Sequence, residues 1–156
     1  MQKITPCLWF DNNAEEAVNH YLSIFKNSKI GQILRCGEAG PGPKGSILTM
    51  TFQLEGQEFM LNGGPVFKFN EAISLSVDCK TQAEVDELWE KLSEGGQKSQ
   101  CGWLKDKFGL SWQVVPSALI KMLQDKNAAK SARVMSAMMQ MNKLDIAKLQ
   151  QAFDGQ

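Results

Sequence analysis

The residues of this 156-residue sequence that could carry out chemistry are few and widely separated. Its single histidine, His20, lies in a segment with helical spacing, where a surface or packing role is expected. One helical histidine leaves no credible Ser-His-Asp or Cys-His nucleophilic site. The four cysteines form no C-x-x-C pair, which predicts reduced, mostly buried thiols at Cys7, Cys36, Cys79 and Cys101.

Other chemical motifs are also missing from the sequence. The loop-forming segment GEAGPGPKG has neither the G-x-G-x-x-G spacing of a dinucleotide site nor the terminal GK[ST] of a phosphate loop. Lysine plus arginine and aspartate plus glutamate both number 17, so no net charge draws the protein to nucleic acid. Without a long apolar run or a signal-peptide pattern, no membrane partner is expected, and a cytoplasmic location is predicted.

The elements that must position any site follow a repeated order. Residues 4–10 are predicted to form a strand and the next fifteen a helix, followed by an apolar run and two strands joined by a turn at Glu55-Gly56. The second half is similar, with a strand at 72–78, a capped helix and a hairpin around Phe108-Gly109. Both halves therefore have the pattern of a βαβββ module.

A shift of 67 residues superimposes the two halves, for example Leu8 on Leu75 and Asp11 on Asp78. The predicted fold class is α+β, with two tandem βαβββ modules sharing one barrel-like sheet. The predicted domains are residues 1–70, 71–116 and a helical tail, 117–156. Methionines at helical spacing in this tail indicate core or dimer packing.

Four stretches resemble a known family. They are FDNNAEEAVNHYLSIF, SLSVDCKTQAEVDELWEKL, WLKDKFGLSWQVVP and ARVMSAMMQMNKLDIAKLQQAF. They are similar to the PhnB-like branch of the vicinal-oxygen-chelate superfamily, which includes glyoxalases and bleomycin-resistance proteins, and this branch is often labelled a demethylubiquinone methyltransferase domain. The resemblance spans nearly the whole chain and implies the glyoxalase/bleomycin-resistance fold. The sequence lacks the glycine-rich turn of common S-adenosylmethionine enzymes, so it does not support the methyltransferase label.

The resemblance also implies where a metal would bind. In metal-using members, histidines and glutamates on the first and last strands of each module converge in an open cavity. The matching positions here are Thr5, Met60, Ala72 and Gln113, and none of these residues has an imidazole or a carboxylate. We therefore expect no metal and no cofactor, and we expect no metal-dependent glyoxalase or dioxygenase reaction.

Strand alternation then predicts which neighbours of these positions line the implied cavity. The other faces of the closing strands, with Phe59, Leu61, Trp112 and Val114, are left to pack on helices. Trp103 and Lys105 are equally suited to the cavity or to solvent, the first as a stacking platform and the second as an anion anchor. The predicted ligand-binding residues are Thr5, Cys7, Trp9, Glu58, Met60, Asn62, Ser74, Ser76, Trp103, Lys105 and Gln113.

Two main functions fit such a cavity. The first is a module that binds a small organic ligand between its modules without chemistry. The alternative is a metal-free enzyme on a small metabolite, in which Cys7, Cys101, Glu58 or Lys105 supplies acid-base or nucleophilic groups, with a strongly shifted pKa as its sign. A filled barrel with a structural or regulatory role also remains open. Tail methionines and the habit of superfamily relatives favour a homodimer.

Overall fold

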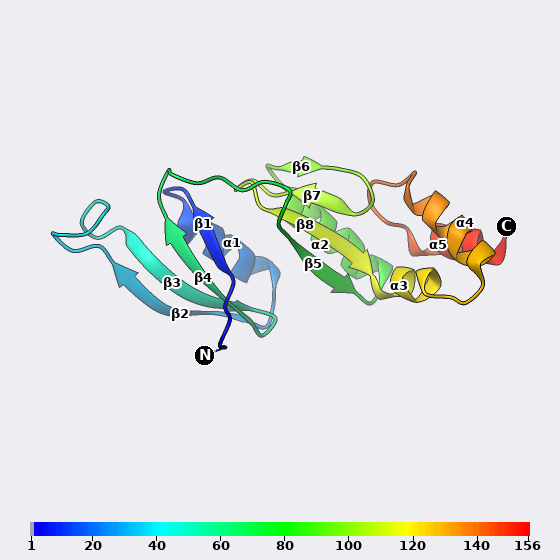
Figure 1. Ribbon diagram of the computed structural model, residues 1–156, viewed down its shortest axis with the longest axis horizontal. Helices are drawn as coiled ribbons and strands as arrows, with labels where there is room; N and C mark the ends of the chain where they lie inside the picture. The colour runs from blue at the N-terminus through cyan, green and yellow to red at the C-terminus, as the bar shows by residue number, and fades with distance from the viewer. Residues whose placement is uncertain (1) are drawn as a thin grey trace. The chain divides into compact units, whose positions relative to one another are not determined.

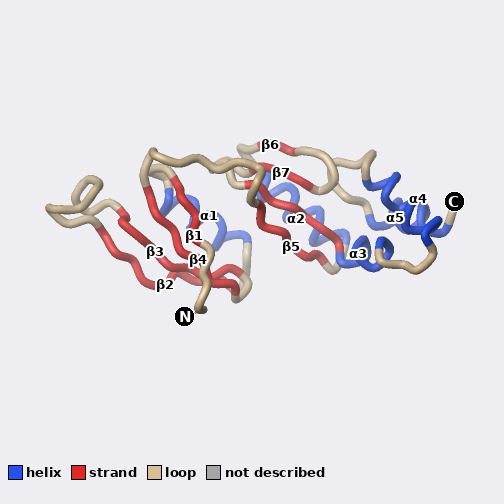
Figure 2. Tube along the Cα trace, in the orientation of Figure 1, coloured by secondary structure: helices blue, strands red, loops and turns tan. Residues whose placement is uncertain are grey.

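The computed structural model describes residues 2–156 and divides into two compact units, one up to Phe69 and the other Asn70–Gln156. Each unit contains one four-stranded sheet with a helix on one face (Figures 1 and 2). The chain order within each unit is strand, helix and three strands. This confirms the predicted α+β fold of two βαβββ modules, but the strands form two four-stranded sheets and not the single shared sheet that was predicted. No helix among residues 2–156 is long and apolar enough to cross a bilayer.

The first unit has the strand order β1-β4-β3-β2, with β1 parallel to β4 and the other pairs antiparallel. Alternate residues of its strands point to α1 and form the core with Tyr21, which is fully buried; they include Phe10, Met50, Phe52 and Leu61. The elements are β1 (Cys7–Phe10), α1 (Ala14–Ile24), β2 (Ser28–Arg35), β3 (Ile47–Leu54) and β4 (Gln57–Gly63).

The second unit repeats this topology as β5-β8-β7-β6, again with one parallel pair, β5 and β8. Thr81 caps its helix by accepting a hydrogen bond from the Glu84 amide at 3.2 Å. Trp89, Leu104, Trp112 and Val114 are buried between the sheet and this helix. The elements are β5 (Ser74–Cys79), α2 (Gln82–Ser93), β6 (Gln97–Lys98), β7 (Trp103–Lys105) and β8 (Ser111–Pro116).

The two hairpins turn where the sequence predicts, but they are supported differently. At the first, Glu55 and Gly56 both have a positive φ (48° and 81°), as a tight hairpin turn requires. At the second, Asp106 is only 3% exposed, and its carboxylate accepts hydrogen bonds from the Phe108 and Leu110 amides and, at 2.8 Å, from the Trp112 indole. A buried carboxylate thus holds the β7–β8 hairpin.

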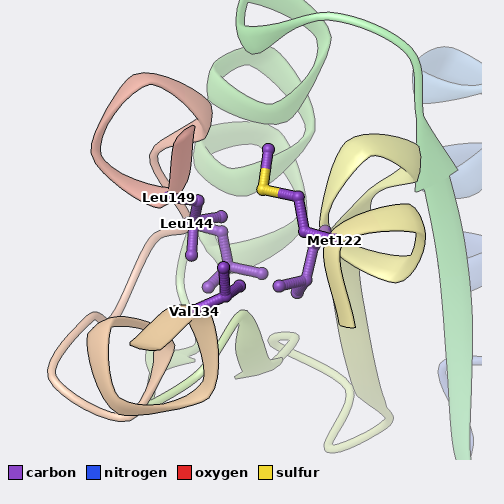
Figure 3. Close-up of a cluster of buried hydrophobic side chains, with 5 residues drawn as sticks. Met122, Val134, Leu144 and Leu149 are labelled. Atoms are coloured by element: carbon purple, nitrogen blue, oxygen red, sulfur yellow. The ribbon is translucent and has the colours of Figure 1, made fainter. Parts of the chain in front are cut away.

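The helical tail is part of the second unit. Its helices are α3 (Ser117–Leu123), α4 (Ala128–Met138) and α5 (Ile146–Asp154), which enclose a buried cluster of Leu119, Met122, Val134, Leu144 and Leu149 (Figure 3). The Gln82 side chain of α2 donates to the Leu144 carbonyl at 3.1 Å and accepts from the Ile146 amide at 2.8 Å. Much of the tail's apolar surface is therefore covered by its own chain, while Met135 and Met139 stay 44% and 53% exposed.

The opening strands of the two modules are shorter at their starts than the sequence predicts. β1 begins at Cys7 because Pro6 has no N–H for the ladder, although its carbonyl still accepts from the Met60 amide at 2.9 Å. β5 begins at Ser74, and the Asn70 side chain instead accepts from the Ala72 amide in a turn. Thr5 and Ala72, two of the implied metal positions, therefore lie outside the strands.

Candidate functional site

In each unit, the sheet face opposite the helix carries the side chains that the sequence assigns to a binding site. In the first unit, Trp9 on β1 lies opposite Asn62 on β4, and Cys7 lies opposite Met60. Paired residues on neighbouring strands point to the same face, so these four share the face that α1 leaves uncovered. Their neighbours Leu8 and Leu61 point the other way and are buried.

A cavity of about 990 Å³ lies over one end of this face. Trp9, Met60 and Asn62 contribute to its wall, together with the Gly- and Pro-rich loop between β2 and β3 and the segment after β4. The Trp9 indole donates a 2.8 Å hydrogen bond to the Gly64 carbonyl, and the Phe67 ring meets it edge-on with centroids 4.9 Å apart. Trp9 is therefore held in place and presents a rigid aromatic wall.

The other residues predicted for the first unit do not line this cavity. Thr5 lies before β1, and its hydroxyl is 3.4 Å from the Gln2 carbonyl. The Glu58 carboxylate accepts from the Gln2 amide at 3.2 Å. Cys7 is exposed, yet partial desolvation raises the pKa of its thiol. A raised pKa leaves less thiolate at neutral pH, which makes Cys7 a weaker nucleophile.

In the second unit, Trp103 and Lys105 line a smaller cavity of about 460 Å³ with Cys101 and Ser111. Lys105 forms a 2.5 Å ion pair with Glu71, and this contact lowers the pKa of the Glu71 carboxyl. Cys101 has a positive φ of 58°, and its sulfur lies 3.8 Å from that of Met139. The cavity therefore has an aromatic wall and an ion pair in which Lys105 is already engaged.

The remaining predicted residues lie beside this cavity on the same sheet. Ser76 on β5 pairs with Gln113 on β8, which pairs in turn with Trp103 on β7. The Gln113 side chain donates a 2.9 Å hydrogen bond to the Ser74 hydroxyl. Ser76 is exposed, so the second unit gathers most of its predicted site residues without placing all of them in one cavity.

The strand register shows that the residue of the first module that corresponds to Gln113 is not the one predicted from the sequence. The 67-residue shift relates Trp9 to Ser76, and these residues lie opposite Asn62 and Gln113, respectively. The first-unit equivalent of Gln113 is therefore Asn62, whereas counting from the turn glycines selects Met60. Neither residue is a strong ligand for a hard divalent cation. Within the described chain, no three His, Cys, Asp or Glu residues are grouped so as to hold a metal ion.

Sequence reasoning missed several residues at these sites. The first cavity is also lined by Thr49 on β3 and by the charged residues Asp11, Glu15 and Arg35. Thr49 could have been found from the turn at Glu55-Gly56, because that turn fixes Thr49 opposite Asn62. The charged residues had no comparable signal, since they lie outside the predicted cavity-lining strand positions.

Comparisons with known proteins agree with this architecture. Residues 2–115 match the family model described as 3-demethylubiquinone-9 3-methyltransferase. No curated protein matches the sequence. Among solved structures, the chain is similar to a putative 3-demethylubiquinone-9 3-methyltransferase, PhnB protein, from Bacillus cereus, with 41% identity over 74% of this chain and 100% of that one and a TM-score of 0.68.

Two more distant structures share the fold. A protein from Pseudomonas aeruginosa is 23% identical, with 74% of this chain and 98% of that chain covered and a TM-score of 0.62. The fosfomycin resistance protein FosX from Listeria monocytogenes is 12% identical, with 80% and 98% covered and a TM-score of 0.58. At these identities the likeness concerns the fold alone.

Proposed function

We propose a function for this chain from the premise that it belongs to the PhnB-like family labelled 3-demethylubiquinone-9 3-methyltransferase, with the fold of the vicinal-oxygen-chelate superfamily. The protein binds a small organic ligand on the uncovered sheet face of its first unit, without a metal ion. The observation that carries this proposal is the cavity of about 990 Å³ whose wall includes Trp9, Met60 and Asn62. Ligand sites are commonly cavities of about 300–1,000 Å³, mostly apolar with a few polar groups.

The test is native mass spectrometry of the gently purified protein, followed by release and identification of any bound compound. We expect one small molecule per chain in the native protein and a reduced bound fraction in Trp9→Ala. Trp103→Ala is the matched control and should retain the compound. A native protein that carries no compound, and binds none from a metabolite extract, contradicts the proposal. The predicted enclosure of the ligand between the two modules stays a prediction.

The proposal excludes a metal because the residues at the implied positions do not fit one. Thr5, Met60, Ala72 and Gln113 offer a hydroxyl, a thioether, a methyl group and an amide. Mn²⁺, Fe²⁺, Ni²⁺ and Zn²⁺ need stronger nitrogen or oxygen ligands. We expect calorimetry with each of these ions to give no stoichiometric binding, and a one-to-one micromolar site that Gln113→Ala abolishes would refute this part of the proposal.

The family's methyltransferase label is not part of the proposal. The connection between β1 and α1 is Asp11-Asn12-Asn13, which contains no glycine. Common S-adenosylmethionine enzymes place a glycine-rich turn between a strand and a helix of a parallel sheet. Calorimetric titration with S-adenosylmethionine should therefore give no heat of binding, and micromolar binding would restore the label.

We also propose that the protein is a homodimer. Supporting observations are the exposed apolar side chains of Ile120, Met135 and Met139 on the tail helices. Deleting the tail would also remove the buried Val134 and Leu149, so the sharper variant is the pair Met135→Glu and Met139→Glu. Light scattering should give twice the 17.4 kDa chain mass for the native protein and less for the variant. A native mass of one chain would rule out the dimer.

A further inference from the structure

Three side chains form one row across the sheet of the first unit. Trp9 on β1 pairs with Asn62 on β4, and Asn62 pairs with Thr49 on β3. The residues of such a row point to the same face, and all three line the cavity of about 990 Å³. The row therefore places an indole, a carboxamide and the threonine side chain side by side along the cavity wall.

The two polar groups of this row are not used by the protein itself. The Thr49 hydroxyl oxygen is buried from solvent and has no hydrogen-bond partner. Thr51, two residues further along β3 and on the same face, differs because its hydroxyl accepts from the Gln32 amide at 2.9 Å. The Asn62 carboxamide makes no hydrogen bond within the part of the chain that the structure describes. A buried hydroxyl without a partner is costly, and a ligand that bonds to it, after rotation of the Thr49 side chain toward the cavity, removes that cost.

The charges around the cavity limit which ligands can bind beside Thr49 and Asn62. Its wall contains two carboxylates, Asp11 and Glu15, and one guanidinium, Arg35. Arg35 is already engaged, at 3.2 Å with Glu15 and at 3.1 Å with the Gly45 carbonyl. An anionic ligand would meet excess negative charge and no free cation among these groups, which disfavours its binding.

We infer that the first unit recognises a neutral ligand with a carboxamide-like edge, placed against Thr49 and Asn62, on a flat ring that packs on Trp9. An amide edge offers one donor and one acceptor side by side, which complements a neighbouring hydroxyl and carboxamide. This inference rests on the proposed function and names its ligand class. Its consequence is selectivity for a neutral amide over a carboxylate of the same shape.

The experiment uses the full chain, labelled with ¹⁵N, and three probes of similar size: benzamide, benzoate and acetophenone. Binding is followed by NMR at the Asn62 side-chain amide and the Trp9 indole. Benzamide should bind about threefold to tenfold more tightly than either of the others, which is the usual range for one hydrogen bond. Thr49→Val should abolish this preference and Thr49→Ser should keep it. Thr51→Val, with the same change on the same strand face outside the cavity wall, should also keep it.

The outcomes distinguish a wrong ligand class from a failure of the proposed ligand binding itself. If all three probes bind equally at Trp9, the cavity binds ligands but the inference is wrong. If benzoate binds most tightly, the site is an anion site at Arg35 and the inference is again wrong. If no probe shifts the Trp9 or Asn62 signals, both the inference and the proposed binding site fail. Spectral dispersion of each variant reports whether it is folded.

Discussion

The uncovered sheet faces of the two units each carry a row of three side chains of matching types, but the hydrogen bonds of the two rows differ. In the first unit the row across β1, β4 and β3 is Trp9, Asn62 and Thr49, and in the second the row across β5, β8 and β7 is Ser76, Gln113 and Trp103. Each row has a central carboxamide between a tryptophan and a hydroxyl, in opposite order.

The difference between the rows lies in the hydrogen bonds of the two amides. Gln113 donates to the Ser74 hydroxyl of its own sheet at 2.9 Å. The Thr49 hydroxyl beside Asn62 has no partner. The two rows share a framework but differ in hydrogen bonding, and this difference supports the proposal that only the first row recognises a ligand.

The largest effect is expected at the β7–β8 hairpin, because only this hairpin of the two is held by a buried carboxylate. Asp106→Ala removes the acceptor of the Trp112 indole and of two hairpin amides. Losing hydrogen bonds to a buried carboxylate should lower the free energy of unfolding by about 3 kcal/mol, measured by urea unfolding with tryptophan fluorescence. Glu55→Asn in the first hairpin is the control and should cost less than about 0.5 kcal/mol. Equal losses at the two hairpins would mean that they are supported alike.

The next largest effect separates the two tryptophans. Trp9→Ala removes the ring that packs on Phe67 and walls the larger cavity, so we expect about 2 kcal/mol lower stability and at least about tenfold weaker benzamide binding. Trp103→Ala should leave the benzamide-induced shifts at Asn62 unchanged. NMR titration checks both variants, and a similar loss of binding in the two would show that the rows do not differ in function.

The two central amides should respond in opposite ways. Asn62→Leu should weaken benzamide binding about threefold to tenfold with little change in stability, since Asn62 makes no hydrogen bond to a described residue. Gln113→Leu should lower stability by about 1 kcal/mol through loss of its bond to Ser74, with benzamide binding unchanged. Thermal unfolding and NMR titration of both variants measure the pattern. If Asn62→Leu is less stable than Gln113→Leu, the two amides do not differ in the way described.

The smallest effect concerns an attachment that only the second unit has, the ion pair between Asp86 on α2 and Lys143 in the tail, 2.7 Å apart. The Lys143 and Gln82 hydrogen bonds lower the pKa of Asp86 in the folded state. Its contribution is therefore present above the ordinary aspartate pKa of about 3.9 and is lost as the pH falls through the lowered value. Because both groups are partly exposed, Asp86→Asn should cost about 0.5 kcal/mol at pH 6 and nothing near pH 2. A loss independent of pH would assign the effect to Gln82 instead.

The fold could be predicted because its signals are local. Alternating apolar residues give the strands, and the Glu55-Gly56 turn fixes the register of β3 on β4, so Phe59 and Leu61 were placed in the core. The predicted starts of β1 and β5 were wrong for an equally local reason. Pro6 and the turn at Asn70 keep Thr5 and Ala72 out of the strand pairing. Pattern alone gives each of these segments an extended conformation but not its hydrogen-bond partners.

The candidate site was less predictable because it depends on contacts between distant segments. Trp9, Met60 and Asn62 lie on strands, and alternation placed them on one face. The pairing of Glu71 with Lys105 has no periodic signal, since Glu71 lies in a turn before β5. The hydrogen bond of Gln113 depends on the side-chain conformation of Ser74, which residue order does not reveal.

The docking of the tail has a consequence for the order in which the protein acquires its structure during synthesis. Every contact within the first unit is available once residue 69 has been made. The second unit needs Leu149 for its buried cluster, and the Gln82 side chain, which also donates to Asp86 on its own helix, gains its two bonds to the tail only once residues 144–146 exist. Domains generally fold as they emerge from the ribosome. The first unit can therefore fold while the chain is still growing, whereas the second unit stays partly exposed until its last helix has been made.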